Sequence, residues 1–255
     1  MMRNILARAN RAVLEQFSWS NVLLAFDYDG TLAPIVSNPK RAPMRASTRE
    51  LLKTLTRLYP VAVISGRARA DAKRQIGEIP VQQVVGNHGL EPWHTSPRLS
   101  EEVARWLPLL ADWFSTLKGV RIENKTFSVA IHYRHSREKR KVKAAISQAV
   151  EALGDLRVVG GKQVVNLLPI GAPHKGAALE RERARLGCDT AIYVGDDETD
   201  EDVFLLQQPG RLLGIRVGRN RSSAATYCIP GQWAIDELLL ALIASRRDAR
   251  SQAAR

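Results

Sequence analysis

Three short apolar runs, each followed at once by polar residues, constrain the fold of this chain more than any other feature. The runs are Val22–Ala25, Val61–Ile64 and Ala191–Val194. Each is too short for a helix and has the composition of a strand buried on both faces of a parallel sheet. Ligands bind at the carboxyl ends of such strands. The pattern therefore predicts an α/β fold with a ligand site along one edge of its parallel sheet.

The residues after the three runs have the chemistry of a binding site. Asp27 and Asp29 follow the first run on a turn broken by Gly30, and two carboxylates this close favour a cation between them, such as Mg²⁺. Ser65-Gly66-Arg67 follows the second run and can bind phosphate oxygens. The third run ends in the acidic segment 195–202. Each motif alone is also an ordinary turn, but recurrence at three strand ends favours one shared site.

The combined set of residues suits phosphoryl transfer. Acidic groups for a hard cation, with a hydroxyl and an ammonium group for an anion, are the parts that this chemistry requires. The candidates are Asp27, Asp29, Asp196, Asp197, Ser65 and Lys175. We find no Gly-rich nucleotide loop and no dinucleotide fingerprint. A carboxylate nucleophile that forms an aspartyl-phosphate is one known solution.

A different pattern interrupts the parallel one in the middle of the chain. It predicts helix, strand, strand, helix, strand, strand, which is an α+β module with an antiparallel sheet. The predicted segments are 101–117, 121–127, 128–134, 137–153, 156–159 and 163–168, with Gly160-Gly161 as a hairpin turn. Boundaries near Pro97 and Gly171 divide the chain into core residues 1–97, an inserted domain 98–170 and core residues 171–255.

The remaining segments predict further core elements. Ser47-Thr48-Arg49-Glu50 has the pattern of a capping box at the start of a helix, and Leu212–Val217 that of a strand. Asp236–Ala244 predicts a closing amphipathic helix, and the residues from Ser245 onward predict a frayed basic tail.

The net charge of +12 permits a nucleic-acid, membrane or small anionic partner. Much of the basic excess lies at the chain ends and on the 137–153 helix, without the interleaved aromatic residues of a single-strand binding platform. No apolar run reaches membrane-spanning length, and Met1 to Phe17 lacks the apolar core of a secretory signal. Cys188 and Cys228 follow no metal-ligand spacing and predict free core thiols. We expect a cytoplasmic monomer that binds neither nucleic acid nor membrane.

The motifs resemble those of a known superfamily. Asp27-Tyr28-Asp29-Gly30-Thr31, Ser65-Gly66-Arg67, Lys175 and segment 195–200 are similar, in this order, to the four motifs of the haloacid dehalogenase (HAD) superfamily. Segments 86–91, 123–125 and 132–134 narrow the resemblance to the trehalose-6-phosphate phosphatase family. The resemblance extends from about Val22 to Leu242. It implies a Rossmann-like core with a parallel sheet and an inserted α+β cap domain. It also implies Mg²⁺-dependent hydrolysis of trehalose 6-phosphate, a phosphorylated disaccharide, in trehalose biosynthesis.

The resemblance also implies a role for each candidate residue. Asp27 would attack phosphorus, and Asp29 would protonate the departing sugar oxygen and then deprotonate water. Mg²⁺ would be held by Asp27, the backbone carbonyl of Asp29, and Asp196, with Asp197 acting through water or a neighbouring ligand. Ser65 and Lys175 would bind the phosphoryl oxygens. The expected substrate-binding residues are Gly30, Gly66, Arg67, His88, Glu123, Lys125, His132, Arg134 and Asn166.

Two positions depart from the family pattern. The family usually has Glu where Asn166 stands, and Arg or Lys where Leu168 stands. The Glu contacts the sugar in the family, so the departure concerns the substrate and leaves the core chemistry intact. One alternative is therefore a phosphatase acting on another sugar or sugar-acid phosphate. A non-catalytic sugar-phosphate sensor is the other, and the presence of a nucleophile argues against it.

Overall fold

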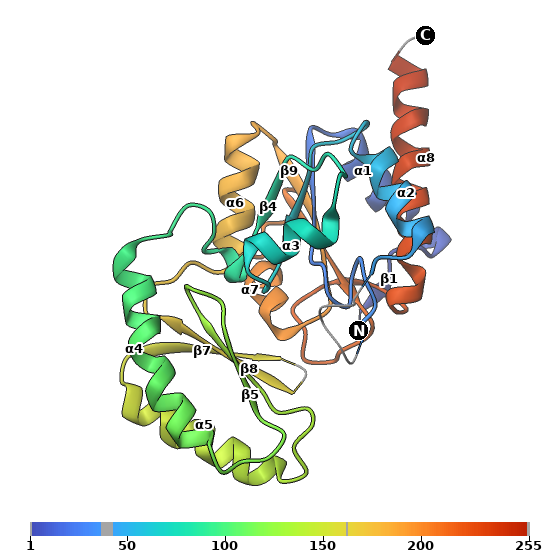
Figure 1. Ribbon diagram of the computed structural model, residues 1–255. Helices are drawn as coiled ribbons and strands as arrows, with labels where there is room; N and C mark the ends of the chain where they lie inside the picture. Colours follow the sequence, from blue (N-terminus) through green and yellow to red (C-terminus); the bar gives the residue numbers. More distant parts are fainter. Residues whose placement is uncertain (1, 37–42, 162, 254–255) are drawn as a thin grey trace.

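The computed structural model describes residues 2–36, 43–161 and 163–253. The chain forms two bodies, a larger core and a smaller cap beside it (Figure 1). The core comes from both ends of the chain, and the cap comes from its middle. The core elements are β1 (Arg3–Asn4), α1 (Arg11–Trp19), β2 (Val22–Phe26), α2 (Ala46–Leu55), β3 (Val61–Ile64), α3 (Arg69–Ile76), β4 (Gln83–Val85), α6 (Lys175–Arg185), β9 (Thr190–Gly195), α7 (Glu201–Phe204), β10 (Leu212–Val217), β11 (Tyr227–Ile229) and α8 (Ile235–Ala253).

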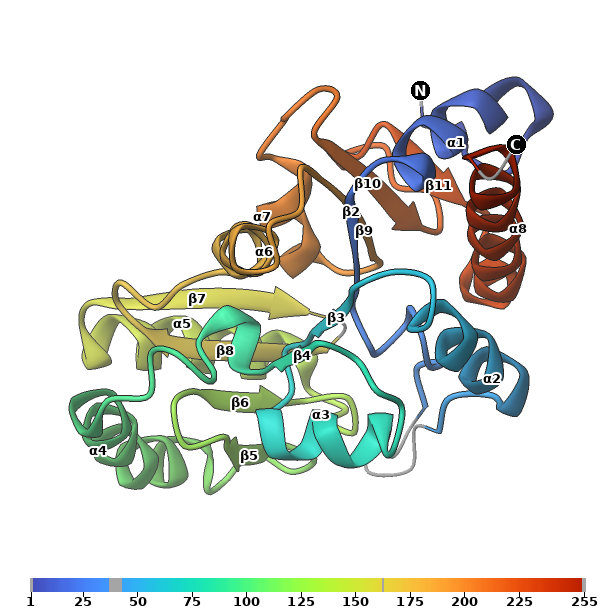
Figure 2. The same cartoon turned by 90° about the horizontal axis from the view of Figure 1, so that it is seen from above.

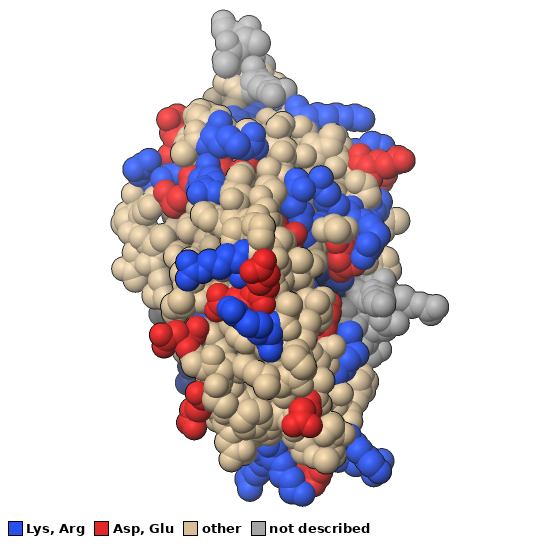
Figure 3. Space-filling view, turned by 60° about the vertical axis from the view of Figure 1, so that its left-hand side comes forward, with Lys and Arg blue, Asp and Glu red and all other residues tan. Residues whose placement is uncertain are grey.

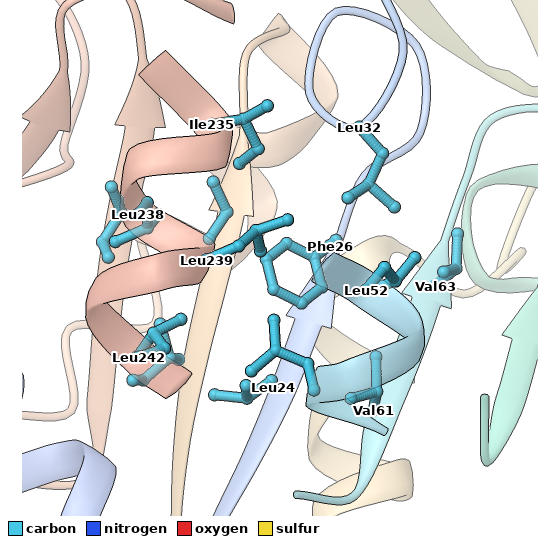
Figure 4. Close-up of a cluster of buried hydrophobic side chains, with 14 of the residues drawn as sticks. Leu24, Phe26, Leu32, Leu52, Val61, Val63, Ile235, Leu238, Leu239 and Leu242 are labelled. Atoms are coloured by element: carbon cyan, nitrogen blue, oxygen red, sulfur yellow. The ribbon is translucent and has the colours of Figure 1, made fainter. Parts of the chain in front are cut away.

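The core sheet is parallel, as predicted, and has the strand order β1-β11-β10-β9-β2-β3-β4. The three apolar runs become the adjacent strands β9, β2 and β3, and every residue of β2 is fully buried. Alternate side chains of β2 point to opposite faces of the core sheet. Leu24 and Phe26 pack with α2 and α8 (Figure 4), whereas Leu23 and Ala25 join the cluster that contains residues of α6 and α7. The resulting three layers fix where each strand ends.

The cap confirms the predicted α+β module. It consists of α4 (Pro97–Phe114), β5 (Arg121–Asn124), β6 (Val129–His132), α5 (Lys139–Leu153), β7 (Leu156–Gly161) and β8 (Val164–Pro169). Its antiparallel sheet has the order β5-β6-β8-β7 and is separate from the core sheet (Figure 2). Helices α4 and α5 cover its outer face. The predicted turn at Gly160-Gly161 was wrong, because both glycines pair with β8 as part of β7.

The predicted basic tail was also wrong. Helix α8 continues to Ala253, so residues 245–253 are helical. The side chain of Ser245 is buried and its hydroxyl hydrogen-bonds that of Ser18 in α1. The guanidinium of Arg246 donates to the carbonyl of Ser20 at 3.1 Å and lies over the ring of Tyr59. Packing against α1 therefore extends the helix beyond the segment that hydrophobic periodicity marks.

Helix α2 begins at Ala46 with Arg45 as its N-cap residue, without a side-chain capping bond. The predicted capping box was therefore wrong. The hydroxyl groups of Ser47 and Thr48 instead donate to the carboxylate of Asp236 at the start of α8. These two hydroxyl groups thus make tertiary contacts with α8 instead of the helix-capping bonds that the local pattern predicts.

In the part of the chain that the structure describes, none of the helices combines the length and apolar character needed to cross a membrane. Both cysteines, Cys188 and Cys228, are buried and free. Basic and acidic side chains are interspersed over the face shown in Figure 3.

Candidate active site

The carboxyl ends of the central strands bring the predicted core residues together. Asp27 follows β2, Ser65 follows β3, and Asp196 follows β9, while Lys175 is the first residue of α6. These residues line one cavity of about 830 Å³, and its other wall is the inner face of the cap sheet. This volume lies within the range of small-molecule sites.

Asp27, Lys175 and Asp196 form the buried, charged floor of the cavity, and Asp200 lies beneath them. The Nζ atom of Lys175 donates to Asp27 Oδ1 at 2.9 Å and to Asp200 Oδ1 at 2.8 Å. Burial raises the pKa of Asp27 well above its usual range, although the Lys175 ammonium opposes this. Burial alone would lower the pKa of Lys175, but Asp200 and Asp27 outweigh it and raise that pKa, so the lysine stays charged.

The same floor has the donor set of a cation site. Asp27, Asp196 and Asp200 each offer one carboxylate oxygen, and these oxygens lie within 4.8 Å of one another. Three carboxylates face one ammonium group, so a bound cation would balance the remaining negative charge. Gly30 leaves room for this approach, because a Cβ atom there would lie 2.3 Å from Asp196 Oδ2, and its φ of +85° is easy only for glycine. Oxygen-only ligands favour Mg²⁺ or Ca²⁺ over softer metals.

Asp29 lies at the edge of the floor and is paired with Arg67. The guanidinium of Arg67 donates from Nε and Nη2 to the two oxygens of Asp29, both at 2.6 Å, and from Nη1 to Asp71 at 2.6 Å. Burial opposes the charge on Arg67, but the bonds to Asp29 and Asp71 outweigh it and raise the pKa of Arg67. The sequence predicted Arg67 as a substrate ligand, and the structure places it on the proton-transfer candidate.

His88 lies between the core and the cap. Its ring packs on Gly66, where a Cβ atom would lie 2.5 Å from His88 Cε1. The Asn166 amide lies next to the ring, but neither ring nitrogen makes a hydrogen bond of good geometry among the described residues. Burial, with the charges of Lys125 and Lys175, lowers the pKa of His88 well below its usual range. The ring is therefore neutral and can donate one bond and accept another.

The inner face of the cap sheet holds the other predicted substrate residues. Strand alternation points Ile131 and Leu167 toward α4 and α5, so His132 and Asn166 point toward the cavity. Glu123 Oε2 and His132 Nε2 lie 2.6 Å apart. This hydrogen bond is the main reason that the pKa of Glu123 falls to about 2.

Lys125 and Arg134 complete the cap side. Lys125 Nζ donates to the Gly66 carbonyl at 2.9 Å and to Asn166 Oδ1 at 3.0 Å, so it joins cap to core. Burial lowers the pKa of Lys125. The Arg134 guanidinium donates to the Val36 carbonyl at 3.1 Å.

Comparisons with known proteins agree with this geometry. The family model described as trehalose-phosphatase matches residues 25–228. The chain belongs to the trehalose-phosphatase family. This is a family of phosphoric monoester hydrolases in the HAD superfamily. A probable trehalose-phosphate phosphatase D of Arabidopsis thaliana is 31% identical, over 91% of this chain and 69% of the relative.

Two further relatives extend the comparison. The trehalose-phosphate phosphatase of Mycobacterium avium is 36% identical, over 80% of this chain and 57% of the relative. The solved structure of the C-terminal domain of C. albicans trehalose-6-phosphate phosphatase has a TM-score of 0.80 at 21% identity. It covers 96% of this chain and 99% of that domain. At this identity the likeness concerns the fold, which is the HAD core with a cap.

Within this trehalose-phosphatase fold, Asp197 lines the cavity, and the acidic segment brings a further carboxylate, that of Asp200, to the site. Asp197 is the N-cap residue of the short helix η4 (Glu198–Asp200), whereas the Asp200 carboxylate joins Asp27 and Asp196. Asp200 also accepts from the hydroxyl of Tyr193 at 2.6 Å. The signal was present in the sequence, since one turn of helix after Asp196 returns Asp200 to the strand end.

Arg216 in β10 supports the site and was not predicted from the sequence. Its guanidinium is buried and donates to the Asp196 carbonyl at 2.6 Å, the Asp197 carbonyl at 3.2 Å and the Glu201 carboxylate at 2.6 Å. Arg216 therefore holds the backbone that presents the Asp196 carboxylate. An arginine within an otherwise apolar strand, Leu212–Val217, is the signal that could have identified it.

Leu168, where the resemblance predicts a basic residue, lies in apolar surroundings. Its side chain is fully buried in an apolar cluster with Leu90, Val159 and Ala172. A basic residue there would place its charge among apolar side chains. The departure at Leu168 is therefore matched by its surroundings in this chain.

Proposed function

We propose that the protein hydrolyses trehalose 6-phosphate to trehalose and phosphate through an aspartyl-phosphate on Asp27. The buried Asp27–Lys175–Asp200 cluster, which opens on a cavity walled by the cap, carries the proposal. An Asp27 oxygen would form a bond to phosphorus while the bond from phosphorus to the sugar oxygen breaks. Water would then attack phosphorus and release Asp27. The Lys175 ammonium would bind a phosphoryl oxygen and offset the charge on the nucleophile.

Asp29 would move the protons. Its carboxyl group would give a proton to the departing sugar oxygen and later take one from the attacking water. The side chain is partly exposed and lies at the cavity, so it can reach the substrate. In this structure both oxygens of Asp29 accept from Arg67. Asp29 would therefore turn from Arg67 toward the substrate oxygen, and cap closure over the substrate would accompany that change.

Asp27, Asp196 and Asp200 would hold the expected Mg²⁺, together with the backbone carbonyl of Asp29. Their three buried carboxylates fit a hard cation. The ion would supply positive charge that stabilises the phosphoryl oxygens in the transition state. Ser65, which is buried at the end of β3, would bind a phosphoryl oxygen from the opposite side.

The cap residues would bind the sugar. The Glu123 carboxylate stays charged because of His132 and can accept bonds from sugar hydroxyl groups. Lys125 and the neutral His88 face the same space, close to the phosphate end. Both ends of a disaccharide phosphate would then be held at once, which orients the phosphoryl group for attack.

A panel of sugar phosphates tests the proposal. We expect the wild-type chain with Mg²⁺ to release phosphate from trehalose 6-phosphate faster than from sucrose 6-phosphate or glucose 6-phosphate. Asp27→Asn should be inactive, because an amide cannot form the acyl-phosphate, with circular dichroism confirming its fold. Substantial turnover by Asp27→Asn would exclude Asp27 as the nucleophile. A preference for another sugar phosphate would refute the substrate and retain the reaction.

A second candidate is hydrolysis of a different sugar phosphate, and Asn166 is the observation that favours it. Lys125 has a neutral amide partner in Asn166, where the family usually supplies a carboxylate. The inner face of the cap thus has one negative charge fewer than the family pattern. The same panel separates the two candidates.

We also propose that the protein acts as a cytoplasmic monomer. The free buried thiols of Cys188 and Cys228 are compatible with a reducing compartment. All the catalytic groups proposed above come from a single chain. Analytical ultracentrifugation tests the oligomeric state, and cell fractionation tests the compartment.

A further inference from the structure

The turn after β4 connects the two halves of the candidate site. Gly86 and Glu91 close this turn by exchanging backbone hydrogen bonds, each of 3.2 Å. The Asn87 backbone N–H donates to the Arg67 carbonyl at 2.7 Å, and that of His88 donates to the Ser65 carbonyl at 3.1 Å. The turn is therefore bound to the loop that would hold the phosphoryl group.

The side chain of Asn87 binds the cap from the same turn. Its Nδ2 group donates to the Lys125 carbonyl at 3.0 Å, and its Oδ1 atom accepts from the Ser128 hydroxyl at 2.6 Å. Nδ2 also donates to the Glu91 carboxylate at 2.7 Å. Asn87 and Ser128 are both fully buried. A side-chain amide offers a donor and an acceptor together, which this position requires.

The cap segment that Asn87 holds is the tip of the β5–β6 hairpin. Lys125 and Ser128 close that tip through a backbone bond of 2.9 Å. The tip carries the Lys125 ammonium group, which reaches the Gly66 carbonyl and Asn166. Glu123 precedes it by two residues on the inner face of the cap. A shift of the tip would therefore move these substrate-facing groups relative to the Ser65–Arg67 loop.

We propose that Asn87 is a positioning residue that fixes the hairpin tip against the Ser65–Arg67 loop. It thereby sets the distance between the sugar-binding groups of the cap and the phosphate-binding groups of the core. A substrate that spans both groups needs this distance held, because orientation at the reacting centre depends on both ends. The choice of a disaccharide phosphate as the probe rests on the proposed function.

The backbone hydrogen bonds that close the turn do not depend on the amide of Asn87, whose one bond within the turn goes to the Glu91 carboxylate. The Gly86–Glu91 backbone bonds close it, and Glu91 also accepts from the Arg69 backbone N–H at 2.7 Å. Asn87 has a φ of +47°, a left-handed conformation that glycine also adopts readily. Asn87→Gly therefore removes the contacts to the cap and keeps the backbone conformation.

Three variants test the proposal. Asn87→Gly removes the amide, Ser128→Ala removes its partner on the cap, and the double variant removes both. Ser147→Ala is the matched control, because its exposed cap hydroxyl bonds the Lys143 carbonyl of its own helix. Each protein is assayed with saturating Mg²⁺ on trehalose 6-phosphate and on p-nitrophenyl phosphate, which is too small to span both bodies. kcat and KM are determined separately.

The ratio of the two kcat/KM values is the decisive readout. We expect it to fall at least tenfold in Asn87→Gly, which removes both cap bonds, and by less in Ser128→Ala, which removes one. The double variant should fall no further than Asn87→Gly, because the glycine has already removed the partner of Ser128. The Ser147→Ala ratio should match wild type. Equal losses on both substrates would indicate a general folding defect and overturn the proposal. An unchanged ratio would overturn it as well.

Hydrogen exchange gives a readout that needs no substrate. We expect the backbone amides of the 124–128 tip to exchange at least tenfold faster in Asn87→Gly than in wild type, while those of α5 are unchanged. Unaltered exchange at the tip would refute the proposal. If wild type failed to hydrolyse trehalose 6-phosphate, the proposed function would be wrong, and the exchange result would decide the role of Asn87.

Discussion

Replacing Lys175 by Met is the perturbation whose consequences the structure defines best. The lysine is 1% exposed and lies between Asp27 and Asp200, at 2.9 and 2.8 Å. Methionine has a similar length and fills the space without the charge. Removing one partner of a buried charge pair costs about 3–5 kcal/mol, because the other charge stays buried. For a chain of this size that corresponds to a fall in Tm on the order of 6–20 °C.

The loss of stability in Lys175→Met should depend on pH. The Lys175 ammonium is what opposes the raised pKa of Asp27, so this pKa rises further in the variant. Between the unfolded value of 3.8 and the folded pKa, the folded state then binds more protons than the unfolded state. Stability therefore falls as pH rises through that interval. We expect the penalty to be larger at pH 8 than at pH 5.

Added Mg²⁺ should partly replace the missing charge. A site with one more unbalanced carboxylate binds the cation more tightly, and binding to the folded state raises its stability. Urea and thermal melts in EDTA and in Mg²⁺ measure both effects, with the exposed Lys143→Met as the control. A Lys175→Met protein within 1 kcal/mol (about one hydrogen bond) of wild type in EDTA would refute the reasoning. So would a Mg²⁺-induced shift no larger than that of wild type.

Three further predictions follow from individual contacts. Arg216→Met should weaken Mg²⁺ binding about tenfold by calorimetry, because the guanidinium orders the metal-site backbone through charged hydrogen bonds; an unchanged Kd would contradict this. His132→Ala should raise the pKa of Glu123 from about 2 toward 4.5 in an NMR titration, because the lost hydrogen bond is its main cause; a pKa still near 2 would exclude it. Asn166→Glu should exceed the equally long Asn166→Gln about fivefold in kcat/KM for trehalose 6-phosphate, since a carboxylate binds sugar hydroxyl groups and Lys125 more strongly than an amide does. Equal values for the two variants would show that charge at this position is unimportant.

The sequence predicted those core strands whose position is determined by a short apolar run of their own. Leu212–Val217 has the predicted bounds, because six residues of strand composition stand between turns. Strand β11 (Tyr227–Ile229) was missed because three residues carry no detectable period. Its place is set by pairing with β10 and with β1, which lies more than 200 residues away in the sequence. Tertiary packing also outweighed the local pattern at Ser47 and at Ser245.

The residues of the candidate site also fall into those that the sequence predicts and those that it does not. Asp27, Ser65 and Asp196 could be predicted because the end of each parallel strand lies at the same edge of the sheet. Asn87 could not, since an Asn in a Gly-flanked turn has the same pattern whether or not its amide binds another domain. The contacts of Arg67 with Asp29 were likewise invisible, because they join segments that no periodicity relates.

The packing of α8 on α1 has a consequence for shortened forms of this chain. Helix α1 leads directly into β2, the strand that ends at Asp27. A stop codon after Ala244 would leave each catalytic motif intact and remove the side chains of Ser245 and Arg246 that bind the α1 end. A gene survey based on motifs would count such a protein as a complete enzyme. We expect such a protein to unfold more readily, and proteases would then remove it before it could act.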